Sequence, residues 1–156
     1  VESWASMSLM KSEEDIKGDG HGFIPRPTDQ RFAFSLFFQD YLPGNPSYKM
    51  NLKLHYSSGL PSGAINSERH EQVFRIPPYR RVDIGFTKVI KDSGQGSKSK
   101  YFKHFDSLWI SAEVFNLFGI RNTISYLWVS DVVQNQYAVP NYLTSRLLNL
   151  KLQAKF

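Results

Sequence analysis

Strict alternation of apolar and polar residues is the feature that most constrains the fold of this chain. From Leu148 to Phe156 every second residue is apolar, and the residues between them are Asn, Lys, Gln and Lys. A period of two puts the apolar side chains on one side of an extended strand and the polar side chains on the other. This segment therefore predicts a β-strand with one apolar face.

Four other segments alternate in the same way, and the opening residues do so less clearly, since Trp4 and Met7 fall on opposite sides. No window repeats its apolar residues at the helical period of about 3.6. We therefore expect an all-β chain of antiparallel strands. The six expected strands are residues 2–10, 32–40, 48–56, 81–87, 108–114 and 148–156.

The connections between these segments differ in length in a regular way. The stretches 11–30, 57–79 and 120–146 are long, the turn at 43–47 is short, and 91–105 is of middling length. Loops as long as the first three are unusual in compact soluble domains. The pattern predicts antiparallel hairpins whose large loops all lie at one end of the sheet.

Composition excludes several classes of protein. The chain has 156 residues, enough for one domain, and no Cys, so disulfides and thiolate sites are absent. No apolar run approaches the roughly 20 residues of a membrane-spanning helix, which argues against a helical membrane protein. The first ten residues lack the basic start of a signal peptide, so we expect any export signal to lie upstream of Val1.

The alternation leaves open what the apolar faces contact. In a soluble sandwich they pack on a second sheet, whereas in a transmembrane barrel they face lipid and the alternate residues line a polar interior. Three features favour lipid: regularly polar alternate positions, aromatic residues at strand ends, and an alternating strand that runs to Phe156. The strand-end aromatics are Tyr41, Tyr48, Tyr56, Tyr79, Phe115 and Phe118.

The lipid interpretation assigns the two faces residue by residue. The residues expected to face lipid are Phe32, Phe34, Leu36, Phe38, Met50, Leu52, Leu54, Ile84, Phe86, Ile110, Val114, Leu150 and Leu152. The residues expected to face the lumen are Lys49, Asn51, Lys53, Arg81, Asp83, Glu113 and Lys151. We expect the basic members of the second set to pair with carboxylates of a plug inside the barrel, with steering of an anionic solute as the alternative.

Six strands do not close a membrane barrel. Bacterial barrels begin at about eight strands, and an open edge leaves backbone groups unpaired in hydrocarbon. We therefore expect the chain to be the C-terminal part of a larger barrel. With the last strand running toward the periplasm, the three long loops emerge outside the cell and the turn at 43–47 lies in the periplasm.

Several runs resemble the C-terminal barrel of TonB-dependent outer-membrane receptors, most closely the type common in Bacteroidetes. They are PRPTDQR (25–31), FFQDYLPGNPSYKMNLKLHYSSGLPSG (37–63), PPYRRVDIG (77–85) and FNLFG (115–119). The last strand, with Leu150, Leu152 and Phe156, is similar to the signal that the outer-membrane assembly machinery recognises. The resemblance covers essentially the whole chain.

The resemblance implies an outer-membrane barrel of about 22 strands that holds an N-terminal plug and takes up a bulky, scarce solute by energy coupling. It implies no enzymatic activity and no cofactor. The partners it implies are outer-membrane lipid and lipopolysaccharide, the plug and the rest of the barrel, periplasmic TonB and a surface lipoprotein. Neither plug nor TonB box occurs in these residues, so transport belongs to the intact receptor.

Two other interpretations stay open on the residues alone. One is a soluble extracellular β-sandwich or barrel that acts as a binding module. The other is a smaller outer-membrane barrel with a structural or adhesive role. A nucleic-acid-binding protein is not indicated, because the net charge of +5 is spread over strands that also carry apolar faces.

No constellation predicts a metal or catalytic site. Residues 15–20 echo a calcium loop, but Lys17 and Arg26 stand where acidic ligands are needed. We therefore expect the nearby acids, Glu13, Glu14, Asp15 and Asp19, to form a solvated loop, with loose ion binding as the alternative. The four histidines, His21, His55, His70 and His104, lie in separate segments without metal-ligand spacing. The glycine pairs 18/20 and 94/96 open no helix, which argues against phosphate loops.

The loops supply the remaining candidates. Trp128, Tyr137 and Tyr142 are candidates for stacking on a ligand, with loop packing as the alternative. Four arginines are expected near the outer strand ends: Arg26, Arg31, Arg80 and Arg146. There they meet lipopolysaccharide phosphates or a lipoprotein, or they form salt bridges that join the bases of the loops.

Overall fold

The fold consists mainly of six long strands. The computed structural model describes residues 2–64, 67–71, 74–92, 104–143 and 145–156. Each alternating segment of the sequence is one of these strands, so the prediction of an antiparallel all-β chain is confirmed. No α-helix occurs in the described ranges, where η1 (Arg69–Glu71) is a single 3-10 turn. The long strands are β1 (Glu2–Leu9), β4 (Phe32–Leu42), β5 (Asn45–Ser57), β8 (Tyr79–Lys91), β9 (Ser107–Phe115) and β12 (Leu147–Lys155).

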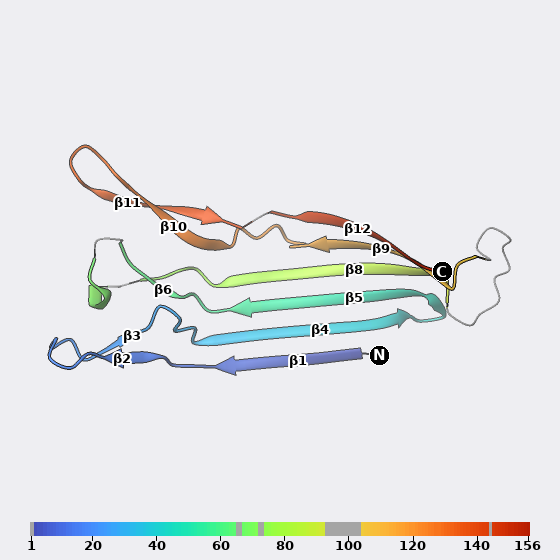
Figure 1. The fold of residues 1–156 in the computed structure, drawn as a ribbon, viewed down its shortest axis with the longest axis horizontal. Helices are drawn as coiled ribbons and strands as arrows, with labels where there is room; N and C mark the ends of the chain where they lie inside the picture. Colours follow the sequence, from blue (N-terminus) through green and yellow to red (C-terminus); the bar gives the residue numbers. More distant parts are fainter. Residues whose placement is uncertain (1, 65–66, 72–73, 93–103, 144) are drawn as a thin grey trace.

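The long strands form one open antiparallel sheet in the order β1-β4-β5-β8-β9-β12 (Figure 1). Each pairs with the next long strand along the chain, which leaves one edge of β1 and one edge of β12 unpaired in the described sheet. The turn between β4 and β5 is shorter than the predicted 43–47. Leu42 already pairs with Asn45, so only Pro43 and Gly44 connect the strands, with Gly44 at a φ of 76° that suits glycine.

All three long connections lie at the same end of the sheet, as predicted, while the β4–β5 turn and both chain ends lie at the other (Figure 1). The treatment of these connections as plain loops is wrong, because each contains a separate two-stranded ribbon. The ribbons pair β2 (Glu13–Asp15) with β3 (Phe23–Pro25), β6 (Pro61–Ser62) with β7 (Phe74–Arg75), and β10 (Thr123–Ser130) with β11 (Gln136–Tyr142). Most of the predicted connection 91–105 lies outside the described residues.

The sheet is a single layer without an enclosed core. Only two hydrophobic residues of the described ranges are buried, Ile24 and Leu108. Leu150 is 71% exposed and Leu152 is 67% exposed, although both belong to the strictly alternating last strand. Among the described residues, no helix has the length and apolar character needed to cross a membrane. Here the apolar residues line a broad surface instead of converging on a closed interior.

Candidate functional site

One face of the sheet is apolar across all six strands. The register places Leu36 opposite Leu54, and it aligns Leu52 with Ile84 and Val114 on consecutive strands. Directly paired residues of antiparallel strands project to the same side. This face contains the whole set that the sequence assigned to lipid, namely Phe32, Phe34, Leu36, Phe38, Met50, Leu52, Leu54, Ile84, Phe86, Ile110, Val114, Leu150 and Leu152.

Pairs of one aromatic and one basic residue mark both ends of this apolar face. At the turn end Tyr48 pairs with Lys88, whose Nζ lies 5.2 Å from the centre of the Tyr48 ring. At the loop end Tyr56 pairs with Arg80. Nine residues of β5 run from one tyrosine to the other, about 26 Å at the usual rise of a strand. A tilted transmembrane strand has about 9–11 residues, and aromatic residues flank its apolar band.

The strand-end aromatics do not all belong to this face. Tyr48 and Tyr56 do, but Tyr41 pairs with Lys49, and Tyr79 and Phe115 likewise project to the opposite side. The prediction of a single aromatic girdle is therefore wrong for Tyr41, Tyr79 and Phe115. The physical reason is parity: they occupy odd positions, and the apolar face consists of even positions in β4, β5, β8 and β9.

The opposite face is polar and contains all the residues that were expected to line a lumen: Lys49, Asn51, Lys53, Arg81, Asp83, Glu113 and Lys151. Their side chains interact both across neighbouring strands and along one strand. Lys53 Nζ lies 3.9 Å from Glu113 Oε1, and Asn149 donates to Glu113 at 3.3 Å. Arg81 Nε donates to Asp83 at 2.7 Å. The face is therefore a connected polar surface, in which Asp83 is buried and the more exposed Lys53–Glu113 pair adds little stability.

A hollow of about 600 Å³ lies on the polar face over β1, β4, β5 and β8. Trp4 and Phe37 stack on one side of it, with ring centres 6.1 Å apart, and Tyr79 meets His55 edge-on at 5.4 Å. Lys53, Arg81 and Asp83 also line the hollow. Aromatic surfaces next to charged groups suit contact with another polypeptide or with a polar solute.

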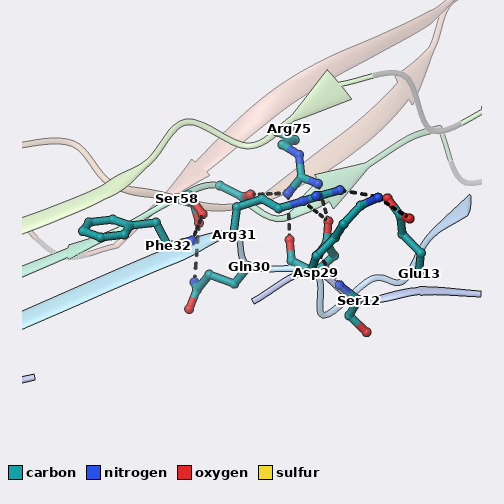
Figure 2. A network of polar contacts seen from close by, with 10 residues as sticks. Ser12, Glu13, Asp29, Gln30, Arg31, Phe32, Ser58 and Arg75 are labelled. Carbon is teal, nitrogen blue, oxygen red and sulfur yellow. Dashed lines mark hydrogen bonds and ion pairs between the residues drawn. The ribbon is translucent and has the colours of Figure 1, made fainter. Parts of the chain in front are cut away.

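Asp29 joins the bases of two loops at the loop end of the sheet (Figure 2). Its carboxylate is fully buried and accepts hydrogen bonds from the Ser12 amide and from Arg31 Nε, both at 2.7 Å. Arg75, from the β6–β7 ribbon, forms an ion pair with the same carboxylate and donates to the Asp29 carbonyl at 2.7 Å. Arg31 also donates to Glu13 at 3.1 Å. The buried charge is thus fully compensated.

The ionisation of Asp29 reflects these contacts. Burial alone would raise the pKa of the Asp29 carboxyl, but hydrogen bonds from the Ser12 amide, Arg75 and Arg31 outweigh it and lower the pKa below its usual range. The Lys11 ammonium lowers the pKa of Glu13, with a further contribution from Arg31. Asp29 therefore stays charged at neutral pH and holds both arginines in place.

Other contacts connect the second long loop to the third. The Phe74 ring of β7 meets Tyr126 edge-on at 5.5 Å and lies 6.3 Å from Trp128, both in β10. At the base, the buried Asn122 side chain bonds the backbone amide and carbonyl of Arg80, each at 2.8 Å. Together with the Asp29 contacts, these interactions tie all three long loops to one another.

The three predicted ligand stackers do not form a cluster. Trp128 pairs with Ala138 and Tyr137 pairs with Val129, so Trp128 and Tyr137 lie on opposite faces of the β10–β11 ribbon. Tyr142 pairs with Thr123 at the base of the ribbon. Since Trp128 packs near Phe74, the alternative of packing between loops describes Trp128 better.

The remaining candidates give no metal centre. In the described ranges, no group of three or more His, Asp or Glu side chains could hold a metal ion. Two acidic residues of the first loop are instead paired with cations: Glu13 with Lys11 at 2.7 Å, and Glu14 with Arg26 at 3.2 Å. The rings of His21 and His70 stack with their centres 3.7 Å apart, a contact that their sequence positions did not predict. The glycine pair 94/96 lies outside the described residues.

Comparisons with known proteins do not assign a family to this chain. No protein-family model matches it, and no match was found among curated proteins or among solved structures. The function must therefore be argued from the two faces of the sheet and from its loop end.

Sequence reasoning missed the loop-base residues Asp29, Arg75 and Asn122. Asp29 lies within the PRPTDQR run, but its partner Arg75 is 46 residues away, and no local pattern connects them. For Asn122 the only signal is its position a few residues after FNLFG. In that run Asn116 takes a φ of 52° and its side chain bonds Ile120 in both directions, at 2.9 and 3.0 Å.

Proposed function

We propose that this chain forms part of the wall and the outer loops of a TonB-dependent outer-membrane receptor, which takes up a bulky, scarce solute. One observation carries the proposal: a single-layered sheet of six strands has one apolar face. Along β5 and β8, aromatic–basic pairs about 26 Å apart flank this face at both ends. In a soluble protein this surface would be exposed to water, and soluble monomers rarely expose contiguous apolar surfaces of this size.

The open edges of the sheet support a larger barrel. A strand edge without partners leaves amide and carbonyl groups unpaired, which is costly in hydrocarbon. Further strands beside β1 and β12 satisfy these groups, and closure removes the edges altogether. We therefore propose that the described sheet is a sector of a closed barrel, with its polar face toward the interior.

The polar face fits contact with a plug. Lys53 and Arg81 line the aromatic hollow, and Lys49 lies over the Trp109 ring on the same face. Carboxylates of a plug domain would complement these cationic groups. Steering of an anionic solute is the other use of the same charges. The tied loop bases then hold the outer loops in the positions from which a solute is first bound.

The last strand fits the proposed assembly signal. Leu150 and Leu152 lie on the apolar face, where both are exposed, and the Phe156 ring packs against Phe105 with centres 4.9 Å apart. An exposed edge strand with a terminal aromatic residue is suited to β-augmentation by an assembly factor.

Cell fractionation of the protein as it is encoded tests the proposal. We expect it in the outer membrane, resistant to extraction at high pH, and running as a compact, heat-modifiable band in gel electrophoresis. A matched pair of variants, Leu52→Lys and Asn51→Lys, probes the two faces at the same depth. The first should reduce the assembled fraction strongly and the second only slightly. Recovery of a folded, monomeric protein from the aqueous fraction would contradict the proposal.

A further inference from the structure

The ribbon of β10 and β11 extends beyond the sheet at its loop end (Figure 1). It contains only these two strands, so each of them has one edge without a strand partner among the described residues. In the same ranges, no backbone hydrogen bond joins β10 to a strand other than β11. An unpaired strand edge presents a row of amide and carbonyl groups, which is a template for a further strand.

The hydrogen bonds at the tip of the ribbon show which residues of β10 present these groups. The Asp131 amide donates to the Asn135 carbonyl at 3.0 Å, so these two residues form a hydrogen-bonded pair. Hydrogen-bonded and non-hydrogen-bonded pairs alternate along an antiparallel ladder. The odd positions of β10 therefore bond to β11, whereas the even positions Tyr126, Trp128 and Ser130 turn their amide and carbonyl groups to the free edge.

Pro140 supports the same assignment. It pairs with Tyr126, an even position, and a proline has no amide hydrogen to donate to a ladder bond. The Pro140 nitrogen therefore lies on the free edge of β11, which lacks a donor there. The two edges of the ribbon thus differ, because residues 124–130 of β10 contain no proline, glycine or charged residue that would protect the strand from pairing.

The side chains beside the free edge of β10 are apolar on both faces. On the even face, the Phe74 ring of β7 lies 5.5 Å from Tyr126 and 6.3 Å from Trp128, measured between ring centres. On the odd face, Leu127 is 63% exposed and Val129 is 46% exposed. A strand added to β10 would place its alternate side chains beside these two surfaces.

The two strands of the ribbon offer no charge to a ligand. Residues 123–130 and 136–142 contain no Asp, Glu, Lys, Arg or His. Asp131 uses its carboxylate within the turn, where it accepts hydrogen bonds from the amides of Val133 and Asn135. Backbone hydrogen bonding and apolar contact are therefore the chemistry that β10 offers. An extended, uncharged peptide matches both, whereas a sugar has no repeated amides at strand spacing.

We propose that β10 binds an extended, uncharged peptide as a third strand of the ribbon, and that such peptides are the class of solute that the receptor takes up. The inference rests on the proposed function, which assigns the ribbon to the outer loops where a solute is first bound. The backbone of Tyr126 and Trp128 forms the ladder to the peptide. A third strand also stabilises the ribbon, because two strands alone are marginally stable in water.

Hydrogen exchange at single-residue resolution tests the site in the detergent-extracted protein, as it is encoded. The probe is an uncharged peptide of Thr, Val and Ser with blocked ends and the eight residues of β10. In the free protein, the Trp128 amide should exchange faster than the Val129 amide, which already bonds to β11. The probe should slow exchange at Tyr126 and Trp128 and change Val129 little.

A control peptide separates strand pairing from apolar contact. It has the sequence of the probe with every backbone nitrogen methylated, so it keeps the side chains but cannot donate hydrogen bonds. We expect it to bind at least about 25-fold more weakly than the probe, because several ladder bonds are lost together.

A matched pair of variants removes one donor from the free edge. Trp128→Pro and Trp128→Thr both remove the ring, but only the first removes the amide that faces the edge. We expect Trp128→Pro to bind the probe about fivefold more weakly than Trp128→Thr. Ser130→Pro against Ser130→Ala repeats the comparison at a position without a ring. Slow exchange at Val129 shows in each variant that the ribbon is still folded.

Uptake distinguishes a transported solute from a bound segment of another protein. Cells with the wild-type receptor should accumulate a dye-labelled form of the probe faster than cells with Ser130→Pro, at equal amounts of receptor in the outer membrane. Equal accumulation would contradict the assignment of peptides as the solute.

Three results would overturn the inference while the protein still assembles in the outer membrane. The first is unchanged exchange at Tyr126 and Trp128 at millimolar probe, and the second is equal binding of the methylated peptide. The third is a dimer of the extracted protein that Ser130→Pro dissociates, which would assign the edge to a second copy of the chain. Recovery of folded wild type from the aqueous fraction would instead contradict the proposed function.

Discussion

Asp29 and Arg75 are 46 residues apart in the chain and form a charged hydrogen bond at a fully buried carboxylate (Figure 2). The pair joins the first long loop to the second where both leave the sheet. Breaking one side of such a pair leaves the other charge in place without its partner, which costs more than the pair itself contributes. We therefore expect the loop bases, rather than the loop tips, to be the rigid part of the loop end of the sheet.

Substitution of Asp29 should loosen both loops. Asp29→Ala removes the carboxylate that Arg31, Arg75 and the Ser12 amide share, and we expect a loss of about 1–3 kcal/mol in local stability. Limited proteolysis should then cut within 11–30 and 58–78 faster than in the wild type. Asp19→Ala, a substitution at a loop turn with a single bond to His21, is the matched control. Equal protection of both variants would contradict the proposed role.

The pH dependence of the junction follows from the lowered pKa of Asp29. A carboxyl whose pKa is lower in the folded state contributes stability that is present above the unfolded value of 3.8 and is lost as pH falls through the folded value. The thermal midpoint of the wild type should therefore be flat from about pH 7 to 5 and fall in stronger acid. Asp29→Asn should remove this part of the acid sensitivity. An unchanged acid profile would argue against a charged Asp29.

Gly59 should tolerate no side chain. A Cβ at this position would overlap the carbonyl oxygen of Ile76, a residue whose backbone amide donates to the Leu60 carbonyl at 2.9 Å. Gly59→Ala should therefore separate the two sides of the β6–β7 loop and expose it to protease. Gly85→Ala is the comparison: the atoms nearest to its Cβ would be those of the Asn51 side chain, which can rotate away. Equal effects of both variants would contradict this explanation.

Asn122 should control the position of the third loop. Asn122→Ala removes both hydrogen bonds to the Arg80 backbone from a buried site, with an expected cost of about 1–3 kcal/mol. Hydrogen exchange at the start of β8 should accelerate. Asn141→Ala is the control, because Asn141 is exposed and makes one bond of 3.4 Å to Ser125. No change in exchange at Arg80 would refute the assignment.

The strands were predictable because alternation is a local property. Leu52 and Asn51 are assigned to opposite faces by sequence position alone, and the register keeps that assignment across β5 and β8. Two aromatic residues of β1 and β4 differ from this pattern. Phe37 and Trp4 occupy polar-face positions and stack on each other, a contact that depends on the pairing of β1 with β4.

The loop contacts were not predictable because they are nonlocal. The β10 strand has apolar residues on both of its faces, so it shows no period of two, and Pro140 interrupts the pattern of β11. The pairing of Asp29 with Arg75, and the stacking of His21 on His70, require the sheet to bring separate loops together. The spacing of these residues along the chain does not indicate that their loops lie close together.

The cost of a charge on the apolar face should depend on depth. Leu52 lies midway between Tyr48 and Tyr56, so Leu52→Lys should cost about 2–4 kcal/mol, whereas Tyr48→Lys should cost about 0–1 kcal/mol. Asn51→Lys, on the polar face at the depth of Leu52, should be mild. Reversible unfolding in lipid vesicles measures all three. A uniform cost along β5 would contradict a bilayer on this face.

A nitroxide label at residue 52 tests most directly whether the apolar face contacts lipid. Because the chain has no Cys, Leu52→Cys gives a single labelling site, and Asp19→Cys in the first long loop gives an aqueous control. In bilayers, we predict that the label at 52 collides often with oxygen, which dissolves in lipid, and rarely with a water-soluble nickel chelate, while the control shows the reverse. A label at 52 that is shielded from both would reveal a second protein layer and contradict the account.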